Sequence, residues 1–266
     1  MKLLLESTAF DALNKSLSFD TVDRNIIGRL ESYSCKMIGE EKAQYKRFNS
    51  DVVPGVNDME VLSPPQTLSE FADDLCFHRQ ARIGCNNVSE SVPATSQSAS
   101  SSSSIPSSVD SSKMLSSFGH KVSRKTLFYL ISTLNASFYP DYDFSNTAPQ
   151  EFSMEPSLEW VIRSIERRLT ISKKSDLSDL NSSLAKLWAK IDDVICLQES
   201  EIYSYNPDLL KYLDPPSDPY FEDGCLWSFY YFFYNVRLKR IVFFTCRAVS
   251  SLTDSSLCSW TPNFDD

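Results

Sequence analysis

Histidine, the most common general base in enzymes, is scarce in this chain. The two histidines are His78 and His120. A hydrolase that uses histidine as its base needs that side chain beside a nucleophile within folded structure. Both histidines lie in or beside a stretch whose composition indicates disorder. We therefore expect no catalytic residues and no enzyme activity.

Paired carboxylates occur twice, at Asp141 with Asp143 and at Asp192 with Asp193. Acidic side chains of this kind are usually solvated surface positions or helix caps. Asp141 and Asp143 could chelate a hard cation, but two ligands are too few for a stable site. The carboxylates do not point to acid–base chemistry.

Metal and cofactor motifs are also weak. Cys76, His78 and Cys85 fall within ten residues, but a structural zinc site needs four ligands at regular spacing. The six glycines make neither a G-x-G pattern nor a Walker loop. We expect no metal and no cofactor.

Ser63 is followed by Pro64 in a stretch that we expect to be flexible. Such a serine is accessible to proline-directed kinases. A phosphate there would add a charge of about −1.5 to −2 and could alter docking to a charged partner or an import receptor. Ser-Pro dipeptides are also frequent in disordered segments, so both a regulatory and an incidental serine remain open.

Basic side chains cluster at two places. Arg237, Lys239 and Arg240 surround a predicted hairpin turn, where they form either a partner-contact or nuclear-import patch or a guard against edge pairing. Arg124 and Lys125 fall in the first turn of a predicted helix, where the helix dipole disfavours cations. Either that helix begins earlier or these two charges serve a partner.

The overall composition is that of a folding, acidic protein. Of 266 residues, 42% are hydrophobic, and the net charge is −9. A negative balance argues against binding nucleic acid through the overall field and favours a partner with a basic surface. Seven cysteines without regular spacing favour a reducing compartment. Since no apolar run approaches the ~20 residues of a membrane helix, and the N-terminus lacks a signal sequence, we expect a soluble, intracellular protein.

The element that organises the chain is a predicted aromatic hairpin, with strands at Leu226–Tyr234 and Leu238–Arg247 and a turn at Asn235–Arg237. Alternate residues of the first strand point to opposite faces, and both faces are apolar, so we expect helices on both sides. Asn235 tolerates positive φ and suits the turn. Cys196 and Cys246 should be small core residues. The alternative is a nucleic-acid-binding module that stacks bases on exposed Trp227 or Tyr231.

The remaining elements surround this hairpin. Helical spacing of apolar residues predicts helices at 7–17, 126–138, 155–171 and 176–195, and alternation predicts strands at 26–37 and 197–205. Serine makes up 15 of the 29 residues from 89 to 117. A stretch of this composition cannot bury enough apolar surface to offset the entropy lost when a chain becomes ordered. We predict one α/β domain with a mainly antiparallel sheet, three larger flanking helices and a long disordered insertion. Its parts would be 1–48 and 118–252 for the globular domain, 49–117 for the Ser-rich linker and 253–266 for a flexible tail.

Several blocks resemble one known family in the same order along the chain. They include LSPPQT from Leu62, SRKTLFYLISTLNASFYPDYDFS from Ser123, EPSLEWV from Glu155, IYSYNPD from Ile202, and EDGCLWSFYYFFYNVRLKRIVFF from Glu222. Together they look like the Maf-one family, the general repressors of RNA polymerase III transcription.

The resemblance implies a function and a mode of regulation. Family members bind RNA polymerase III near its clamp and block its recruitment to promoter-bound transcription factor IIIB. Kinases of the TOR pathway, or protein kinase A, phosphorylate the linker and keep the repressor inactive or cytoplasmic; a phosphatase and the import machinery reverse this. By this resemblance Ser63 is the regulatory phosphorylation site, and the protein shuttles between nucleus and cytoplasm.

The chain also departs from the family pattern. Tyr230 stands where the family usually has Asn, and Val236 replaces a basic residue, which weakens the patch at 237–240 by one charge. The loop before Asp218 is longer, at 209–217. The acidic tail is reduced to little more than Asp254, Asp265 and Asp266.

Overall fold

The computed structural model describes residues 2–4, 7–50, 59–65, 120–172, 177–207 and 224–251. Within these residues one sheet of seven strands has the order β1-β3-β9-β8-β7-β6, with β2 also pairing with β3, and every pairing in it is antiparallel. Its strands are β1 (Lys2–Leu3), β2 (Phe19–Asp20), β3 (Arg24–Ser34), β6 (Phe152–Met154), β7 (Glu201–Tyr205), β8 (Cys225–Asn235) and β9 (Arg240–Ser250). A second, two-stranded sheet joins β4 (Met59–Val61) to β5 (Lys121–Ser123).

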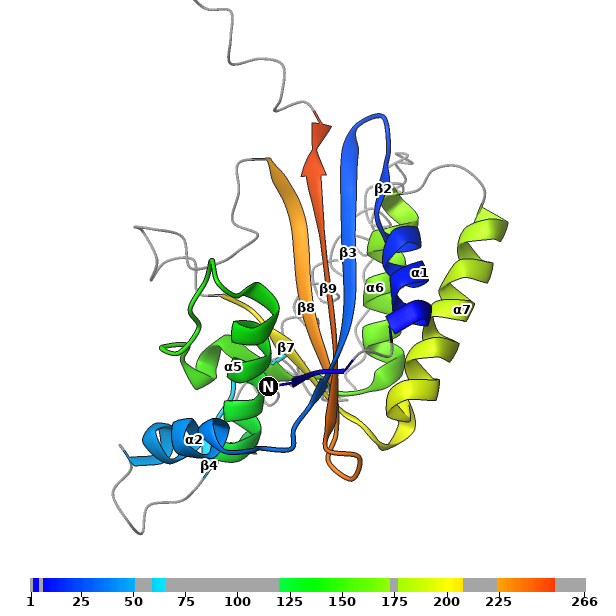
Figure 1. The fold of residues 1–266 in the computed structure, drawn as a ribbon. Coiled ribbons are helices and arrows are strands. Elements are labelled where there is room, and N and C mark those ends of the chain that lie inside the picture. The colour runs from blue at the N-terminus through cyan, green and yellow to red at the C-terminus, as the bar shows by residue number, and fades with distance from the viewer. Residues whose placement is uncertain are drawn as a thin grey trace, which may run out of the picture.

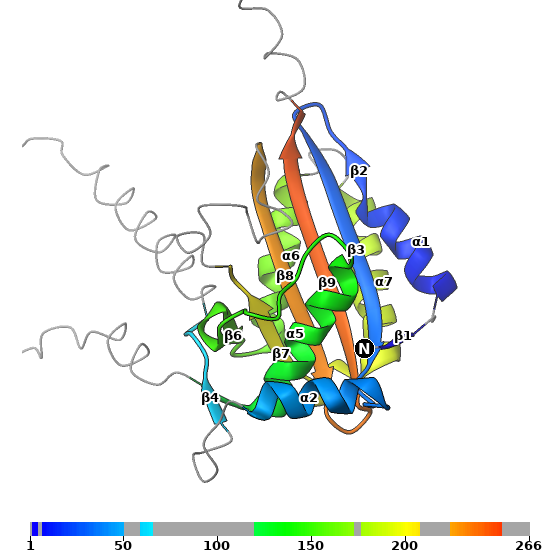
Figure 2. The ribbon, with the colours of Figure 1, turned by 60° about the vertical axis from the view of Figure 1, so that its left-hand side comes forward.

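Helices cover both faces of the large sheet (Figure 1). On one face lie α1 (Ser7–Leu17), α6 (Leu158–Ser172) and α7 (Leu177–Ile195). On the other lies α5 (Arg124–Phe138), with α2 (Glu40–Ser50) beside it near the β8–β9 turn (Figure 2). The predicted α/β class, the mainly antiparallel sheet and the flanking helices are confirmed.

The β8–β9 hairpin lies within the sheet, as predicted. Phe229, Tyr231 and Phe233 face the first helical layer, whereas Tyr230 and Phe232 face α5. Phe232 is opposite Phe243 in the register, with the ring centroids 4.8 Å apart and both side chains fully buried. Burial on both faces explains why this sequence lacks the polar alternation of a half-exposed strand.

The hairpin turn lies further along the chain than predicted. Asn235 is the last residue of β8 and pairs with Arg240, so the turn is Val236–Lys239. Lys239 has the positive φ of 52°. The Asn235 side chain stabilises the turn instead, accepting a hydrogen bond from the Leu238 backbone N–H at 3.0 Å and donating one to the Ile195 carbonyl at 2.9 Å.

The strand predicted at 26–37 corresponds to β3, which contributes buried side chains to the helical layers on both faces of the sheet. Ile26 and Leu30 are buried with the α1–α6–α7 layer, and Tyr33 is buried on the α5 face. This change of face is the slip in the apolar pattern that the sequence shows near Leu30. Gly28 allows α1 to end close to the sheet, since a Cβ on Gly28 would lie 2.7 Å from the Leu17 Cβ.

Three local predictions were wrong. The helix expected at 155–171 begins at Leu158 because Glu155 still belongs to the sheet region, its backbone N–H donating to the Ile202 carbonyl at 2.8 Å. The strand expected at 197–205 starts with a 3-10 turn, η2 (Leu197–Glu199). Cys196 is exposed at that turn with a positive φ of 54° and is not a core residue, unlike the fully buried Cys246.

Disorder was predicted too broadly at its start. Within the range 49–117, α2 continues to Ser50 and residues 59–65 form β4 and its extension. The reason is local burial: Leu62 is 2% exposed and its N–H donates to the His120 carbonyl at 2.9 Å. The rest of that range, including Cys76, His78 and Cys85, lies outside the described residues, as do the loop at 209–217 and the tail at 253–266.

Candidate interaction site

Ser63 lies against an edge of the sheet. The short strand β4 continues into Leu62 and Ser63, and the Ser63 N–H donates to the Phe152 carbonyl at 3.0 Å, making a parallel bridge to Ser153 of β6. The Ser63 hydroxyl donates to the Gln150 carbonyl at 2.5 Å, and the Ser153 hydroxyl donates to the Pro64 carbonyl at 3.1 Å. The residues around Ser63 therefore form an added, hydrogen-bonded strand at the β6 edge.

This geometry makes the Ser63 hydroxyl chemically sensitive. In its present state the hydroxyl is a hydrogen-bond donor to a carbonyl oxygen. A phosphoryl group has acceptor oxygens and a charge of about −1.5 to −2, so it would place an anion against the Gln150 carbonyl. Modification at Ser63 would break this bond and favour release of the strand.

The basic residues at the hairpin turn do not form one patch. Arg237 is 79% exposed and its nearest carboxylate is Glu199 at 3.4 Å. Arg240 is half-buried and donates to the Val194 carbonyl at 3.1 Å, near the end of α7. Lys239 is exposed and lines a cavity on the α5 side of the sheet. Adjacent positions at the turn thus point to different neighbours.

Arg124 and Lys125 also separate. Arg124 forms an ion pair with Glu60, donates to the Asn49 side chain at 3.0 Å and to the Phe48 carbonyl at 2.6 Å, and lies over the Phe48 ring at 4.8 Å. Its side chain therefore joins α2, β4 and α5 and is not available as a partner contact in this state. Lys125 is exposed and lines the same cavity as Lys239.

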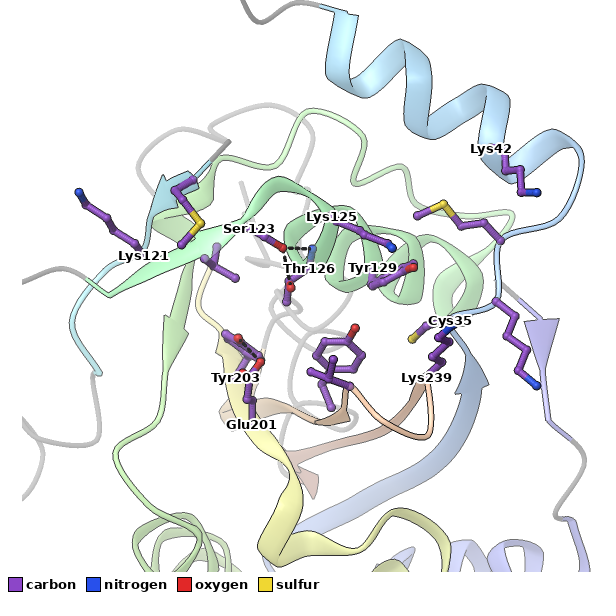
Figure 3. A pocket seen from close by; sticks show the side chains of 16 residues that line it. Cys35, Lys42, Lys121, Ser123, Lys125, Thr126, Tyr129, Glu201, Tyr203 and Lys239 are labelled. Atoms are coloured by element: carbon purple, nitrogen blue, oxygen red, sulfur yellow. Dashed lines mark hydrogen bonds between the residues drawn. The ribbon is translucent and has the colours of Figure 1, made fainter. Parts of the chain in front are cut away.

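That cavity, of about 640 Å³, lies between the β4–β5 sheet, the first turns of α5, the β8–β9 turn and the segment from Cys35 to α2 (Figure 3). We call it the lysine pocket. Figure 3 shows Lys42, Lys125 and Lys239 around one end of it and Lys121 at the other. The lysines of its lining are Lys36, Lys42, Lys121, Lys125 and Lys239.

Three of these five lysines, Lys36, Lys42 and Lys121, were not among the predicted site residues. Each is isolated in the sequence, and they come together only because the fold joins distant segments of the chain. The one signal available was the placement of Arg124 and Lys125 at a helix start. In the structure α5 begins at Arg124, because Ser123 caps the helix by accepting a hydrogen bond from the Thr126 N–H at 3.0 Å.

Protonated phenols and a neutral thiol lie beside these lysines. Burial raises the pKa of Tyr129 to about 12 and is also the main cause that raises the pKa of Tyr234. Burial likewise raises the pKa of the Cys35 thiol to about 12. All three groups line the pocket as neutral donors at physiological pH.

Residues considered for catalysis or metal binding have structural roles. Asp143 accepts a hydrogen bond from the Ser145 N–H at 2.9 Å, and Asp192 accepts one from the Leu197 N–H at 2.8 Å. His120 is exposed, and its backbone carbonyl accepts a hydrogen bond from the Leu62 N–H. In the described part of the chain no three His, Cys, Asp or Glu side chains are grouped closely enough to hold a metal ion. No helix in the same residues has the length and apolar character to cross a bilayer.

Comparison with known proteins agrees with the sequence resemblance. The "Maf1 regulator" family matches residues 26–245. The chain is 37% identical over 256 residues to the "Repressor of RNA polymerase III transcription" of Dictyostelium discoideum, covering 93% of this chain and 85% of the relative. A Schizosaccharomyces pombe repressor of the same name is 31% identical, covering 90% and 79%.

The fold agrees as well. The crystal structure of citrus MAF1 in one space group superposes with a TM-score of 0.54 at 29% identity, covering 92% of this chain and 98% of that one. A second crystal form gives a TM-score of 0.51. With a family match over 26–245 and two relatives above 30% identity along most of their length, this chain belongs to the Maf1 regulator family.

Proposed function

We propose that this protein represses transcription by RNA polymerase III, acting as a binding protein and not as an enzyme. The observation that carries the proposal is the family match over 26–245. Two relatives that align with this chain over most of their length are named for this repression. In the described residues, Asn235 and Asp192 stabilise turns, and Ser63 and Ser153 attach a strand edge.

The proposed mechanism is occlusion. The protein binds the polymerase core near its clamp and blocks recruitment to promoter-bound transcription factor IIIB. A domain whose sheet is covered on both faces presents a fixed outer surface. Such a surface excludes a competing protein without any change in its own fold.

The test is a promoter-dependent transcription reaction with purified polymerase and transcription factor IIIB on a transfer RNA gene. The protein should lower the transcript yield when it is added to the reaction before the polymerase. It should have a much smaller effect once the polymerase is already assembled on the promoter. Equal inhibition in both orders, or none in either, rules out blocked recruitment.

We further propose that phosphorylation of Ser63 switches the repressor off. Kinases of the TOR pathway or protein kinase A would add the phosphate, a phosphatase would remove it, and the import machinery would respond by moving the protein between cytoplasm and nucleus. The contacts of Ser63 support this, since a phosphate would oppose the Gln150 carbonyl and release the strand at the β6 edge.

Ser63→Ala should lower transfer RNA output in growing cells, and Ser63→Glu should raise it if charge alone is sufficient. Ser63→Ala also loses the hydrogen bond to Gln150, worth about 1 kcal/mol. Ser153→Ala is the matched control, because it removes the neighbouring bond to Pro64 and leaves the Ser63 hydroxyl in place. Transfer RNA output that is unchanged by both Ser63 variants would remove Ser63 from the switch.

The turn residues can be tested separately from the fold. Reversing Arg237 and Lys239 to Glu should weaken binding to the polymerase or nuclear entry, with an unchanged melting temperature, since both side chains are exposed. Arg240 is left intact because it donates to the Val194 carbonyl. Normal capture of the polymerase and normal nuclear entry would reject a role for this turn.

The nucleic-acid-binding alternative loses its geometric basis. It requires an exposed aromatic beside the basic turn, but Tyr231 is 2% exposed. Trp227 pairs with Ala248 at the end of the hairpin away from the turn and stacks on Phe229 at 6.0 Å between ring centroids. A gel shift with short RNA should therefore show no specific complex.

A further inference from the structure

The lysine pocket has a charge opposite to that of the protein as a whole. The chain carries a net charge of −9, yet five lysines line this one cavity, with Glu201 as its only acidic lining residue among those described. Glu201 accepts a hydrogen bond from the Tyr203 hydroxyl at 2.8 Å. Within the described residues none of the five ammonium groups has a carboxylate at salt-bridge distance.

The lysines reach the pocket from separate parts of the fold. Lys36 follows β3, Lys42 is on α2, Lys121 is on β5, Lys125 is on α5, and Lys239 ends the β8–β9 turn. Like charges gathered in one cavity repel each other, and their field raises the local concentration of anions. A tertiary fold that brings five lysines together, with Glu201 as the one carboxylate of the described lining, creates a site that an anion would stabilise.

The pocket also contains neutral hydrogen-bond donors. Tyr129 and Tyr234 both line it and are each only 5% exposed. Neither hydroxyl has a hydrogen-bond partner among the described residues, whereas the Tyr203 hydroxyl nearby is bonded. Both hydroxyl oxygens are open to the pocket, since neither is among the buried, unpartnered polar atoms of the described residues. Two hydroxyls that open into a cationic cavity can both donate to the oxygens of a bound anion.

The first turn of α5 points to the same ligand. Lys125 is in that turn, where the helix dipole disfavours a cation and favours an anion. The neighbouring Arg124 is neutralised by Glu60. Lys125 and Tyr129, spaced i and i+4, are on the same side of the helix and both line the pocket (Figure 3). An anion in the pocket would offset the charge of Lys125.

We propose that the lysine pocket binds a small, soluble molecule that carries several phosphoryl groups. Lysine ammonium groups act as point charges for phosphate. A single phosphate would leave most of the five positive charges unpaired, whereas a polyphosphorylated molecule would match them. The volume of about 640 Å³ is in the range of small-molecule sites. A nucleic-acid strand is disfavoured because the aromatic rings here are buried and offer no faces for base stacking.

Ligand binding would also affect the edge that carries Ser63. Met59 and Lys121 line the pocket from the paired strands β4 and β5, and Ser63 is in the extension of β4. A molecule that bridges Lys121 to Lys239 would hold the β4–β5 sheet against the hairpin. Since ligands stabilise the state that binds them, occupancy should protect this region from opening.

The test uses the full-length protein at 150 mM salt, with binding of myo-inositol hexakisphosphate measured by calorimetry and by thermal shift. We expect saturable binding with one site per chain and a rise in melting temperature. Lys42→Glu with Lys125→Glu should weaken binding at least about tenfold, because each loses a charge-assisted contact. Lys15→Glu with Lys186→Glu is the matched control, with the same charge change on the exposed surfaces of α1 and α7 across the sheet.

The hydroxyl variants distinguish a formed site from general attraction. Tyr234→Phe should weaken binding about threefold while keeping every charge. Equal losses in the two lysine pairs, or no binding at 150 mM salt, would overturn the proposal. So would a peptide of residues 61–67, phosphorylated on Ser63, if it binds more tightly than inositol hexakisphosphate and tripolyphosphate, because the pocket would then serve a phosphorylated segment.

Discussion

The centre of the sheet and its β6 edge are stabilised in different ways. In β8 and β9 the rings of Phe232, Phe243 and Phe244 are fully buried between helices. At the edge, residues 62–65 are attached by the buried side chain of Leu62 and by a few hydrogen bonds, including the one from Ser63 to Gln150. Apolar burial is undirected and additive, whereas each of these hydrogen bonds depends on one donor. The centre therefore sets global stability, and the edge can respond to a change in a single group.

The largest expected effect is at the centre. Phe232→Ala should lower the free energy of unfolding by about 3–5 kcal/mol, because the ring is fully buried and contacts both Phe152 and Phe243. Chemical denaturation measures this loss. Leu238→Ala, at a 42% exposed position of the adjoining turn, is the control and should change stability by less than about 0.5 kcal/mol. Comparable losses would mean that the centre is not the main source of stability.

This contrast also explains which features the sequence could predict. The centre has a repeated signal, since consecutive apolar residues such as Phe229, Tyr230 and Tyr231, which point to opposite faces, indicate a strand with two covered faces. The helix at 7–17 matches α1 because Phe10 and Leu17 share one face. Packing of this kind depends on many residues in a local pattern, so one substitution or a small boundary error does not hide it.

The edge and the pocket lack such a pattern. Strand β4 has three residues, and its pairing with Lys121–Ser123 joins segments about sixty positions apart. Lys36, Lys42 and Lys121 look like ordinary surface lysines until the fold places them together. Conversely, Arg237 and Arg240 are close in sequence but have different neighbours, because a turn reverses the chain between them. Proximity in the sequence was therefore a poor guide to which side chains share the same surroundings.

A smaller effect is expected where one side chain joins several edge elements. Arg124→Met should cost about 1–3 kcal/mol, because it leaves Glu60 without its ion pair and removes the donors to Asn49 and Phe48. Amide exchange should show the loss in α2 and β4 first, with β8 and β9 still protected. Arg163→Met, which changes an arginine on α6, is the control. Uniform loss of protection would show that the edge and the centre open as one unit.

A still smaller and more local change is expected at Ser63. Ser63→Glu should reduce the exchange protection of the Leu62 and Ser63 amides about tenfold, since a carboxylate would face the Gln150 carbonyl. The global free energy of unfolding should change by about 1 kcal/mol or less. Ser153→Ala should reduce the same protection by a smaller factor. Unchanged protection of both amides would mean that the edge strand tolerates the charge.

The smallest perturbation that separates the two regions is chemical labelling of thiols. Cys246 is completely buried in the centre, and burial is the main cause that raises its pKa to about 12. At pH 8 its thiolate fraction is therefore about one part in ten thousand. Cys196 is exposed at the end of α7. Iodoacetamide at pH 8 should modify Cys196 within minutes and leave Cys246 unmodified, as peptide mass mapping would show.

Raising the pH links this labelling to stability. A thiol whose pKa is higher in the folded state favours folding below its unfolded value of about 9, and that contribution falls as pH rises from 9 toward 12. Labelling of Cys246 should therefore begin only above pH 9 and should follow unfolding of the sheet, while labelling of the exposed Cys196 requires no unfolding. If Cys246 were labelled at pH 8 while β8 and β9 kept their amide protection, the centre would open locally. The distinction between a fixed centre and a responsive edge would then be wrong.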